Sequence, residues 1–342
     1  MNTFGKLIAT SVLALAPSVL TAETNLIFNA FLPPHDELRQ NAIENFAKAI
    51  EKETNGSVTV TIPDTTLAPS DRQYEMVRDG IADMALASSG TVRQMVALNQ
   101  IADLPLNSPS SRAASIALWE TYQKYFVPIG EFKGVHVLAT TVLPGRQVLS
   151  VSDKTVDSVD AFAGVKLWSP PGRLTGVAKA LGAVPVNSEF TDLFEYVSKG
   201  TVDAVIMTPG SADGARILDN VKSIANVPGG LGSLSFSVFI AQERWDSLTD
   251  EERAAITRAA QAIPAAAGAA ADHEEAELAP QIASIPTHVF EGDELAKLND
   301  RLARSIEDWK ASAKERGIEN PDEVLAFYRS VLERELAAQP AN

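Results

Sequence analysis

The sequence of 342 residues contains no cysteine, and aromatic residues make up 6% of it. The absence of cysteine excludes disulfide bonds, thiolate metal sites, cysteine nucleophiles and a lipid-modified N-terminal cysteine. With four histidines in the whole chain, we do not expect a transition-metal site. Acidic residues outnumber Lys and Arg by 44 to 29, and the net charge of -15 argues against nucleic acid as a partner.

The motifs of common enzyme classes are also missing. Residues 210–214 (Gly-Ser-Ala-Asp-Gly) do not have the order of a nucleophile elbow. Residues 228–232 (Pro-Gly-Gly-Leu-Gly) lack the spacing of a dinucleotide-binding loop and are interpreted as a turn. No phosphate-binding loop with Lys and Ser or Thr occurs. We therefore expect a protein that is not an enzyme and needs no cofactor.

The N-terminus carries a long apolar run. Lys6 precedes an apolar stretch at 7–20, and Ala22 supplies a small residue before Glu23. This pattern is typical of a secretory signal peptide over residues 1–22. A short membrane anchor is the alternative, but the run is below the ~20 apolar residues that a spanning helix needs. We expect a protein that is free in an extracytoplasmic space, of which a bacterial periplasm is the simplest.

Two stretches of the chain, 74–88 and 194–208, have nearly the same pattern. Each predicts a helix that stops at a glycine, then a turn that carries an aspartate, then an apolar strand. The two strands end at Ser88 and Thr208. A second echo lies upstream, where Phe31 and Trp168 each follow a strand-like run and precede a Pro-Pro pair. The repeat predicts two similar α/β lobes with a ligand cleft at the strand ends.

The order of elements predicts the fold class, an α/β protein of two lobes. Strand-like and helix-like segments alternate along the chain, which is typical of mainly parallel sheets flanked by helices. We expect lobe I to comprise residues 23–143 plus about 234–275, and lobe II 144–233 plus about 276–342. The alanine-rich stretch 254–279 predicts one long helix kinked at Pro264, with a flexible linker as the alternative.

Several motifs, taken in order, carry a resemblance to a known family. They are Gly-Arg-Gln at 145–147, Asp-Ala-Phe-Ala-Gly-Val-Lys-Leu at 160–167, Leu-Gly-Ala-Val-Pro-Val at 181–186 and the repeat segment at 194–204. The mature chain resembles the solute-binding proteins of tripartite ATP-independent periplasmic (TRAP) transporters, the DctP-like family. The resemblance implies a two-lobed periplasmic-binding-protein-like fold, with lobes joined by crossing strands and a long helix. It also implies ligand capture by hinge closure and delivery to an ion-gradient-driven permease.

The chain departs from the family pattern at two ligand positions. Family members mostly clamp an organic acid with an arginine after the strand that ends at Leu167, and Trp168 stands there in this chain. Thr208 replaces a frequent asparagine, whereas Arg146 matches a second arginine often near the ligand. One expectation is that the ligand is an organic acid, a carboxylate or sulfonate, held by Arg146. Alternatively it is an amine, amino alcohol or aromatic compound held between Phe31 and Trp168.

The alternatives without a ligand role are a surface position for Arg146 and a core position for Trp168. The ten residues expected to bind ligand are Phe31, His35, Asp71, Ser88, Arg146, Trp168, Arg173, Phe190, Thr208 and Phe236. The expected partners are a small molecule and the TRAP permease, and the expected state is a monomer. A ligand-sensing subunit of a signalling system is a further alternative, and an α/β hydrolase ranks below it.

Overall fold

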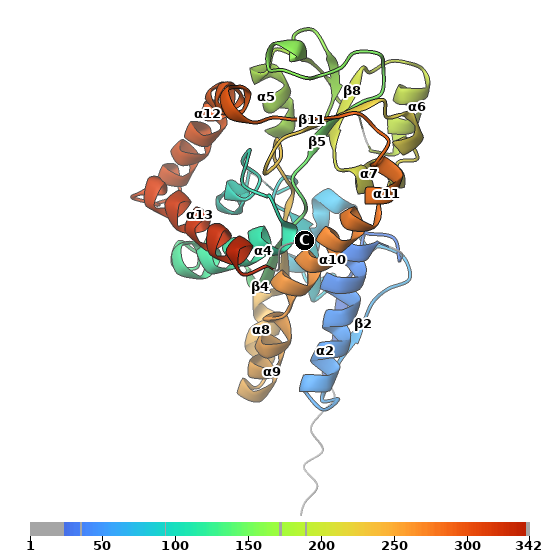
Figure 1. The fold of residues 1–342 in the computed structure, drawn as a ribbon. Coiled ribbons are helices and arrows are strands. Elements are labelled where there is room, and N and C mark those ends of the chain that lie inside the picture. The colour runs from blue at the N-terminus through green and yellow to red at the C-terminus, as the bar shows by residue number, and fades with distance from the viewer. Residues whose placement is uncertain (1–23, 35, 93, 171–172, 189, 340–342) are drawn as a thin grey trace, which may run out of the picture.

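The computed structural model describes residues 24–34, 36–92, 94–170, 173–188 and 190–339. The chain forms two lobes, each built on one β-sheet and placed one above the other in Figure 1. Lobe I, the lower one, contains the N-terminal strands, and lobe II contains the middle of the chain. Among the described residues, no helix has the length and apolar character needed to cross a membrane.

Lobe I contains a five-stranded sheet with the order β2-β1-β3-β10-β4. Strands β1, β2 and β3 run parallel, and β10 is antiparallel to both of its neighbours. The strands are β1 (Thr24–Asn29), β2 (Val58–Thr61), β3 (Met84–Ser88), β4 (Val135–Val142) and β10 (Ser235–Ala241). All residues of β3 and β10 are buried, so these two strands form the centre of the lobe.

Lobe II contains a six-stranded sheet with the order β11-β9-β5-β8-β6-β7. Strands β6, β7 and β8 run parallel, and β5 is antiparallel to β8 and β9. The strands are β5 (Gln147–Ser150), β6 (Lys166–Trp168), β7 (Val184–Val186), β8 (Ala204–Met207), β9 (Ser223–Asn226) and β11 (Thr287–Val289).

The two sheets repeat one plan, as the sequence repeat predicts. The parallel unit β2-β1-β3 of lobe I corresponds to β7-β6-β8 of lobe II. Next to it lie β10 and β4 in lobe I and β5 and β9 in lobe II. The chain passes from β4 directly into β5 and from β9 directly into β10, so segments 143–146 and 227–234 cross between the lobes. The two-lobed α/β fold with crossing strands is confirmed, and β5 and β10 are its antiparallel strands.

The aspartate of each repeat has the same local function. Asp83 Oδ2 accepts a hydrogen bond of 2.7 Å from the backbone N–H of Ile27, at β1. Asp203 Oδ2 accepts one of 2.8 Å from the backbone N–H of Lys166, at β6. A cation also pairs with each carboxylate, from Arg244 in the first case and from Lys154 in the second. The aspartates thus fix the first strand of each parallel unit, so the repeat reflects folding.

Helices cover both sheets. Those of lobe I are α1 (Glu37–Arg39), η1 (Gln40–Glu44), α2 (Asn45–Glu53), η2 (Ser70–Arg72), α3 (Gln73–Arg78), η3 (Leu98–Ile101), α4 (Ser111–Thr121), η4 (Tyr122–Phe126), α8 (Gln242–Ser247) and α9 (Asp250–Ala260). Those of lobe II are η5 (Asp160–Phe162), α5 (Arg173–Ala180), η6 (Phe190–Asp192), α6 (Leu193–Ser198), α7 (Pro209–Gly214), η7 (Leu218–Asn220) and α11 (Ala279–Ile282). The others are α10 (Ile263–Glu277), α12 (Gly292–Glu315) and α13 (Pro321–Ala337).

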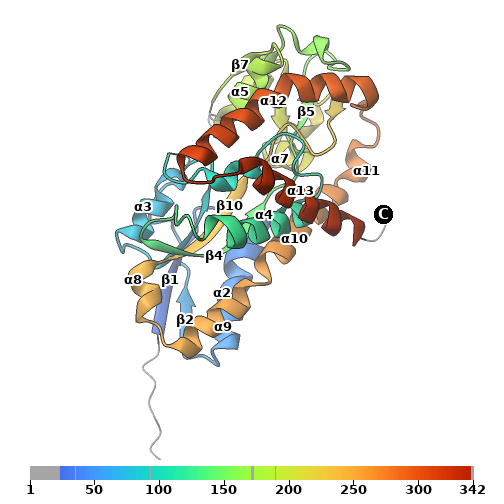
Figure 2. The same cartoon turned by 90° about the vertical axis from the view of Figure 1, so that its left-hand side faces the viewer.

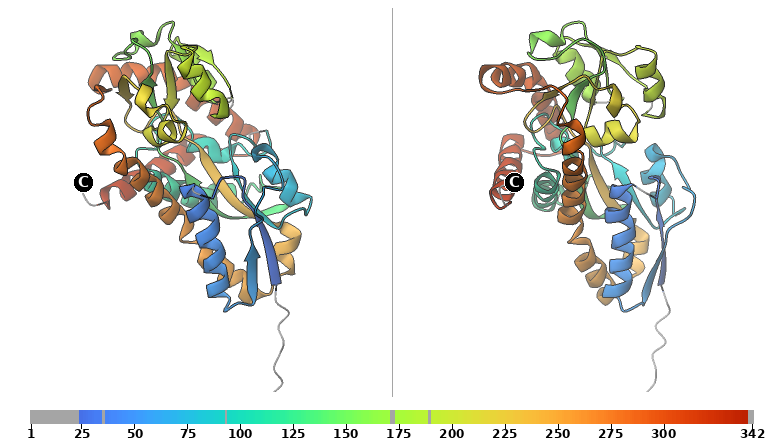
Figure 3. Two further views of the ribbon diagram at one scale, coloured as in Figure 1. Left: turned by 90° about the vertical axis from the view of Figure 1, so that its right-hand side faces the viewer. Right: turned by 45° about the vertical axis from the view of Figure 1, so that its right-hand side comes forward.

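The alanine-rich stretch forms two helices, and the expectation of one helix kinked at Pro264 is wrong. Helix α9 ends at Ala260, and α10 begins at Ile263 with Pro264 in its first turn. The backbone N–H groups of the first helical turn have no partner within the helix, so a proline costs no hydrogen bond there. Pro264 is therefore compatible with the start of a helix. The two helices follow one another along α2 in Figure 3.

Helix α10 runs from lobe I to lobe II (Figures 1 and 3). Its Gly268 lies so close to α4 that an added Cβ would be 2.5 Å from the Cα of Arg112. Asp272 accepts hydrogen bonds from the backbone N–H groups of Ser111 and Arg112 at the start of α4. Near its C-terminal end, Glu275 accepts a hydrogen bond of 3.1 Å from the backbone N–H of Gly210 in α7. The helix is therefore fastened to both lobes.

The C-terminal helices connect the lobes a further time. Leu298 and Leu302 of α12 are buried in a core cluster of lobe II, whereas Trp309 of the same helix is buried in the core of lobe I. Helix α13 packs on α4, and its Tyr328 is buried in the core of lobe I. Figure 2 shows α12 along the upper lobe and α13 below it. The helices α12 and α13, which we expected in lobe II, thus contribute to both cores.

Candidate functional site

The two crossing segments meet at Arg146. Its backbone N–H donates to the carbonyl of Gly232 at 2.9 Å, and its carbonyl accepts from Leu231 at 2.8 Å. A Cβ added to Gly230 would lie 2.5 Å from the backbone of Gly145, so glycine is required for this approach. The segment 228–232, interpreted from sequence as a turn, therefore holds the Arg146 backbone at the boundary between the lobes.

The Arg146 side chain is buried, with 8% of its surface exposed. Within the described part of the chain, its guanidinium donates one hydrogen bond, a long one of 3.5 Å to the carbonyl of Ile206 in β8. Burial lowers the pKa of Arg146 to about 10, and the carboxylates of Asp103 and Glu275 oppose this shift. The group is still a cation at neutral pH, so the fold holds a weakly partnered positive charge between the lobes.

A polar segment of lobe I lies beside this cation. Gln100, from η3, donates to the carbonyl of Ser89 at 3.1 Å and accepts from Arg173 Nη2 at 2.7 Å. Ser235, at the start of β10, donates its hydroxyl to Ser89 Oγ at 2.9 Å and its backbone N–H to Asp103 Oδ1 at 2.6 Å. A hydrogen-bonded chain therefore runs from Arg173 in lobe II to Asp103 in lobe I.

The carboxyl of Asp103 is buried, with 6% exposure. Burial raises its pKa to about 6, against the opposing effects of its hydrogen bond from Ser235 and of the charges on Arg173 and Arg146. The Arg173 guanidinium is also largely buried, and this lowers its pKa from the usual value. Two largely buried cations and one buried carboxyl thus act on one another electrostatically.

Three polar atoms in this region are buried without a hydrogen-bond partner among the described residues. They are Asn99 Oδ1, Thr140 Oγ1 and Arg173 Nε. A buried polar atom without a partner costs ~1–3 kcal/mol, and such atoms are rare in folded proteins. Asn99 donates to Ser237 Oγ, and Thr140 pairs with Ser237 across β10 and β4, so two of these atoms lie near each other in lobe I. A polar ligand that reached them would supply the missing partners.

The hydroxyl residues at the strand ends cap the turns that follow them. Ser88 Oγ accepts from the backbone N–H of Gly90 at 3.2 Å, and Thr208 Oγ1 accepts from that of Ser211 at 3.1 Å as the N-cap of α7. The Thr208 hydroxyl also donates to Ser211 Oγ at 3.1 Å, and burial raises the pKa of Glu275, which accepts from the neighbouring Gly210 N–H. The two residues occupy equivalent places in the two lobes, and their role toward a ligand stays a prediction.

Two of the predicted aromatic residues lie in hydrophobic cores. Trp168, with 1% exposure, ends β6 within a core cluster of lobe II, and its Nε1 donates to Ser188 Oγ at 2.9 Å. Phe236 is buried in the core of lobe I, where β10 pairs with β3. A ligand meets Trp168 only if the side chain becomes accessible, so the aromatic clamp stays a prediction.

Of the remaining predicted residues, the structure describes three. Phe31 is partly buried and packs against the core of lobe I. Asp71 is exposed in η2, and Phe190 is 49% exposed in η6, at the equivalent place of lobe II. His35 lies outside the described residues. The structure therefore brings Arg146 and Arg173 to one polar cluster, and it does not bring Asp71 or Phe190 there.

Sequence reasoning missed Asn99, Gln100, Asp103 and Glu275. The first three are polar side chains inside the largely apolar run 96–106, and that contrast was the available signal. Glu275 is one of four acidic residues at 272–277, a pattern typical of a solvated helix face, but its carboxylate accepts a hydrogen bond from the N–H of Gly210. No group of three or more His, Asp or Glu side chains suited to a metal ion occurs among the residues that the structure describes.

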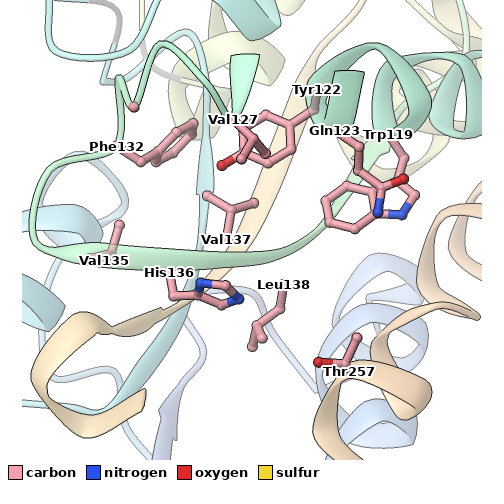
Figure 4. Close-up of a pocket in the computed structure, with 11 residues that line it drawn as sticks. Trp119, Tyr122, Gln123, Val127, Phe132, Val135, His136, Val137, Leu138 and Thr257 are labelled. Carbon is pink, nitrogen blue, oxygen red and sulfur yellow. The ribbon is translucent and has the colours of Figure 1, made fainter. Parts of the chain in front are cut away.

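A cavity of about 310 Å³ lies elsewhere in lobe I (Figure 4). Trp119, Tyr122 and Val127 line it together with the first half of β4, whereas Arg146 follows the far end of that strand. Its lining includes no Lys or Arg, and burial lowers the pKa of His136, which keeps the imidazole neutral at neutral pH. The cavity offers no countercharge to an acid, so the polar cluster at Arg146 is the better candidate.

Comparison with known proteins gives one consistent family. The profile of the family described as "Bacterial extracellular solute-binding protein, family 7" (DctP) matches residues 28–312. The chain is 31% identical, over 96% of its length and 98% of the relative's, to the "Outer membrane transporter protein TsaT" of Comamonas testosteroni.

Solved structures show the same fold. A TRAP periplasmic solute-binding protein of Bordetella bronchiseptica, with (R)- and (S)-mandelate bound, has a TM-score of 0.82 at 24% identity and covers 91% of this chain and 99% of its own. A TRAP solute-binding protein of Rhodoferax ferrireducens in complex with benzoate has a TM-score of 0.78 at 20% identity, covering 92% and 99%. The chain belongs to the DctP family of bacterial extracellular solute-binding proteins, the solute-binding proteins of TRAP transporters.

Proposed function

We propose that this protein captures a small aromatic acid, a carboxylate or a sulfonate, between its two lobes and delivers it to a TRAP permease. The observation that carries the proposal is the Arg146 guanidinium, a buried cation with one long hydrogen bond among the described residues. A guanidinium offers paired N–H donors that match the two oxygens of an acid group. An acid ligand would supply the partners that the protein leaves out.

The surroundings of Arg146 support an acid over an amine. Arg173 adds a second guanidinium, and its buried Nε has no hydrogen-bond partner in the described part of the chain. Asp103 is the carboxyl on which both arginines act. When Asp103 is protonated, the two guanidinium charges are no longer balanced by it, and the region is net positive. An amine ligand would bring a third cation into this region, which is costly at low dielectric.

The aromatic character of the ligand is inferred from the relatives and from Trp168. Mandelate and benzoate, bound by the two TRAP proteins of similar fold, are both aromatic carboxylates. In this chain Trp168 stands where the family pattern has its clamp arginine, which leaves Arg146 as the principal cation for the acid. By the pairing register, Asn29 of β1 is the counterpart of Trp168, and Phe31, partly buried two residues beyond β1, is a second ring that the ligand could contact.

The location and partners follow from family membership and from the N-terminal sequence. Members of the family are extracellular solute-binding proteins. We infer that residues 1–22 are a signal peptide, that the mature protein is free in the periplasm, and that it works as a monomer that binds without turnover. A ligand-sensing subunit uses the same binding step, and a TRAP permease encoded beside this protein would favour transport over sensing.

A thermal-shift screen of the purified protein tests the proposal. Benzoate, mandelate and benzenesulfonate represent aromatic acids, succinate an aliphatic acid, and benzylamine an aromatic amine. A ligand that binds the folded state alone stabilises it by ~2.7 kcal/mol at 100 times its Kd, so a binder raises the melting temperature clearly. We expect the aromatic acids to raise it most and benzylamine to leave it unchanged.

The variant Arg146→Met, with Arg258→Met as its control, assigns the effect to the site. Arg258 lies on the surface of α9, paired with Glu53 at 3.1 Å. Removing a hydrogen-bonded charge costs ~1.5–3 kcal/mol, so Arg146→Met should weaken binding ~10- to 150-fold and Arg258→Met should not change it. Stabilisation by benzylamine alone, or equal binding by both variants, would contradict the proposal.

A further inference from the structure

Asp103 is a buried carboxyl of lobe I, and its negative charge would repel an acid bound at Arg146. It follows η3, and one of its oxygens, Oδ1, accepts the backbone N–H of Ser235 at 2.6 Å. The side chain is enclosed, and no ion pair within 4.0 Å is formed by it in the described part of the chain. Its negative charge is therefore compensated by cations that are not in direct contact with it, Arg146 and Arg173.

Charged and titratable groups face Asp103 from three elements. They are Arg146 on the crossing segment, Arg173 at the start of α5 and Tyr328 on α13. Tyr328 is buried, its pKa is raised, and its hydroxyl donates to the carbonyl of Asn107 at 2.9 Å, so it stays neutral. In the absence of ligand, Asp103 is thus the carboxyl that the two arginines share, and Glu275 acts on Arg146 from α10.

An acid bound at Arg146 changes this balance. The ligand brings a second negative charge to the same arginines, and two acid groups that share one buried site cannot both stay ionised at low cost. The oxygen Oδ2 of Asp103 is the atom that can receive a proton, because Oδ1 is occupied by Ser235 N–H. A proton from solvent on Oδ2 removes the repulsion and leaves the existing hydrogen bond intact.

We propose that Asp103 takes up one proton when an anionic ligand binds beside Arg146 and Arg173, so that ligand capture is coupled to protonation of this carboxyl. The inference rests on the proposed function, since it requires a ligand that is an anion. Protonation removes the charge with which Asp103 would otherwise repel the anion, so Asp103 sets the pH dependence of binding.

The coupling fixes the direction of the pH dependence. Burial already places the pKa of Asp103 at about 6 in the free protein, and the ligand's charge raises it further. Between the free and bound pKa values, each unit of pH weakens binding by up to ~10-fold, because one proton is bound with each ligand. Below about pH 6 the dependence levels off, because Asp103 is protonated before the ligand arrives.

Isothermal titration calorimetry with benzenesulfonate tests the proposal, because a sulfonate stays ionised over the whole range. Titrations at pH 6.5, 7.5 and 8.5, in two buffers of different ionisation enthalpy, count the protons taken up per ligand bound. We expect uptake approaching one proton and a Kd that rises with pH. Zero uptake at all three pH values would overturn the proposal.

Two variants assign the proton. Asp103→Asn keeps an oxygen for Ser235 N–H, and it should abolish proton uptake and bind at pH 8.5 at least ~10-fold more tightly than the unmodified protein. Glu275→Gln is the matched control, because it removes a second buried carboxyl near Arg146 and should retain the uptake. Uptake that persists in Asp103→Asn, or that is lost in Glu275→Gln, would assign the proton elsewhere and overturn the proposal.

The wild-type proton count decides the question by itself if Asp103→Asn does not fold. Failure of benzenesulfonate, benzoate and mandelate to bind at any pH is a different result, since it would remove the proposed function. Binding without proton uptake removes the role of Asp103 alone.

Discussion

Substitution of Trp168 separates the core role of this residue from a ligand role. Its indole has 1% exposure, lies among the core residues of lobe II and donates to Ser188 Oγ at 2.9 Å. The change Trp168→Ala removes a large, enclosed ring, and the surrounding side chains can refill such a space only in part. We therefore expect a large loss of stability that does not depend on any ligand.

The size of the loss follows from the burial. Truncation of a buried Trp to Ala typically costs ~3–5 kcal/mol, including the cavity that remains. At ~2–4 °C per kcal/mol for a chain or domain of this general size, the melting temperature should fall by on the order of 10 °C. The matched control is Phe194→Ala on α6 of the same lobe, where the ring is 52% exposed and a change within ~1 kcal/mol is expected.

Urea unfolding followed by circular dichroism, without ligand, measures this loss. A change of less than ~1 kcal/mol in Trp168→Ala would refute the core role, because surface substitutions have effects of that size. The aromatic clamp makes a separate prediction, which is tested with the milder variant Trp168→Leu. A clamp requires weaker binding of benzoate by ~10-fold or more, so an unchanged Kd would remove it.

Three other predictions concern stability. Asp203→Ala should cost ~1–3 kcal/mol in urea unfolding, because the N–H of Lys166 loses its partner. Gly230→Ala should lower the melting temperature by several degrees, since its φ is +76° and an added Cβ meets backbone at 2.5 Å, whereas Gly214→Ala, with open space around it, should not. The pKa of Asp103 is about 6 in the folded protein and 3.8 for an ordinary aspartate, so ionisation of this carboxyl destabilises the folded state as pH rises from about 4 to about 6. Asp103→Asn should remove up to ~3 kcal/mol of this pH-dependent decrease in the free energy of unfolding. An unchanged pH dependence of unfolding would contradict the raised pKa of Asp103.

Local patterns were sufficient to predict the two-lobed plan. The helix-Gly-Asp-strand repeat reflects contacts within one β-α-β unit, and Asp83 and Asp203 make equivalent hydrogen bonds in the two units. The position of β10 between β3 and β4 depends instead on a partner 90 or more residues away along the chain, which no local pattern contains. The same limit applies to α13, whose apolar face is satisfied by α4 of lobe I.

The candidate site was predicted in part, for a physical reason. Arg146 was recognisable because the family pattern surrounds it in sequence. Asp103 was not, because its burial and its pKa depend on Ser235, which is 132 residues away, and on two arginines of other elements. Trp168 was singled out because a tryptophan replaces the family's arginine. Whether its ring can contact a ligand depends on its solvent exposure, which the sequence alone does not give.

The position of an acid ligand relative to Arg146 tests the central claim most directly. A crystal structure of the protein with benzenesulfonate, or with benzoate or mandelate if these bind more tightly, locates the acid group. We expect its oxygens within hydrogen-bond distance of the Arg146 guanidinium, between the lobes, with Arg173 and Asp103 nearby. An acid group bound elsewhere, for example in the cavity beside Trp119 and Tyr122, would contradict the account.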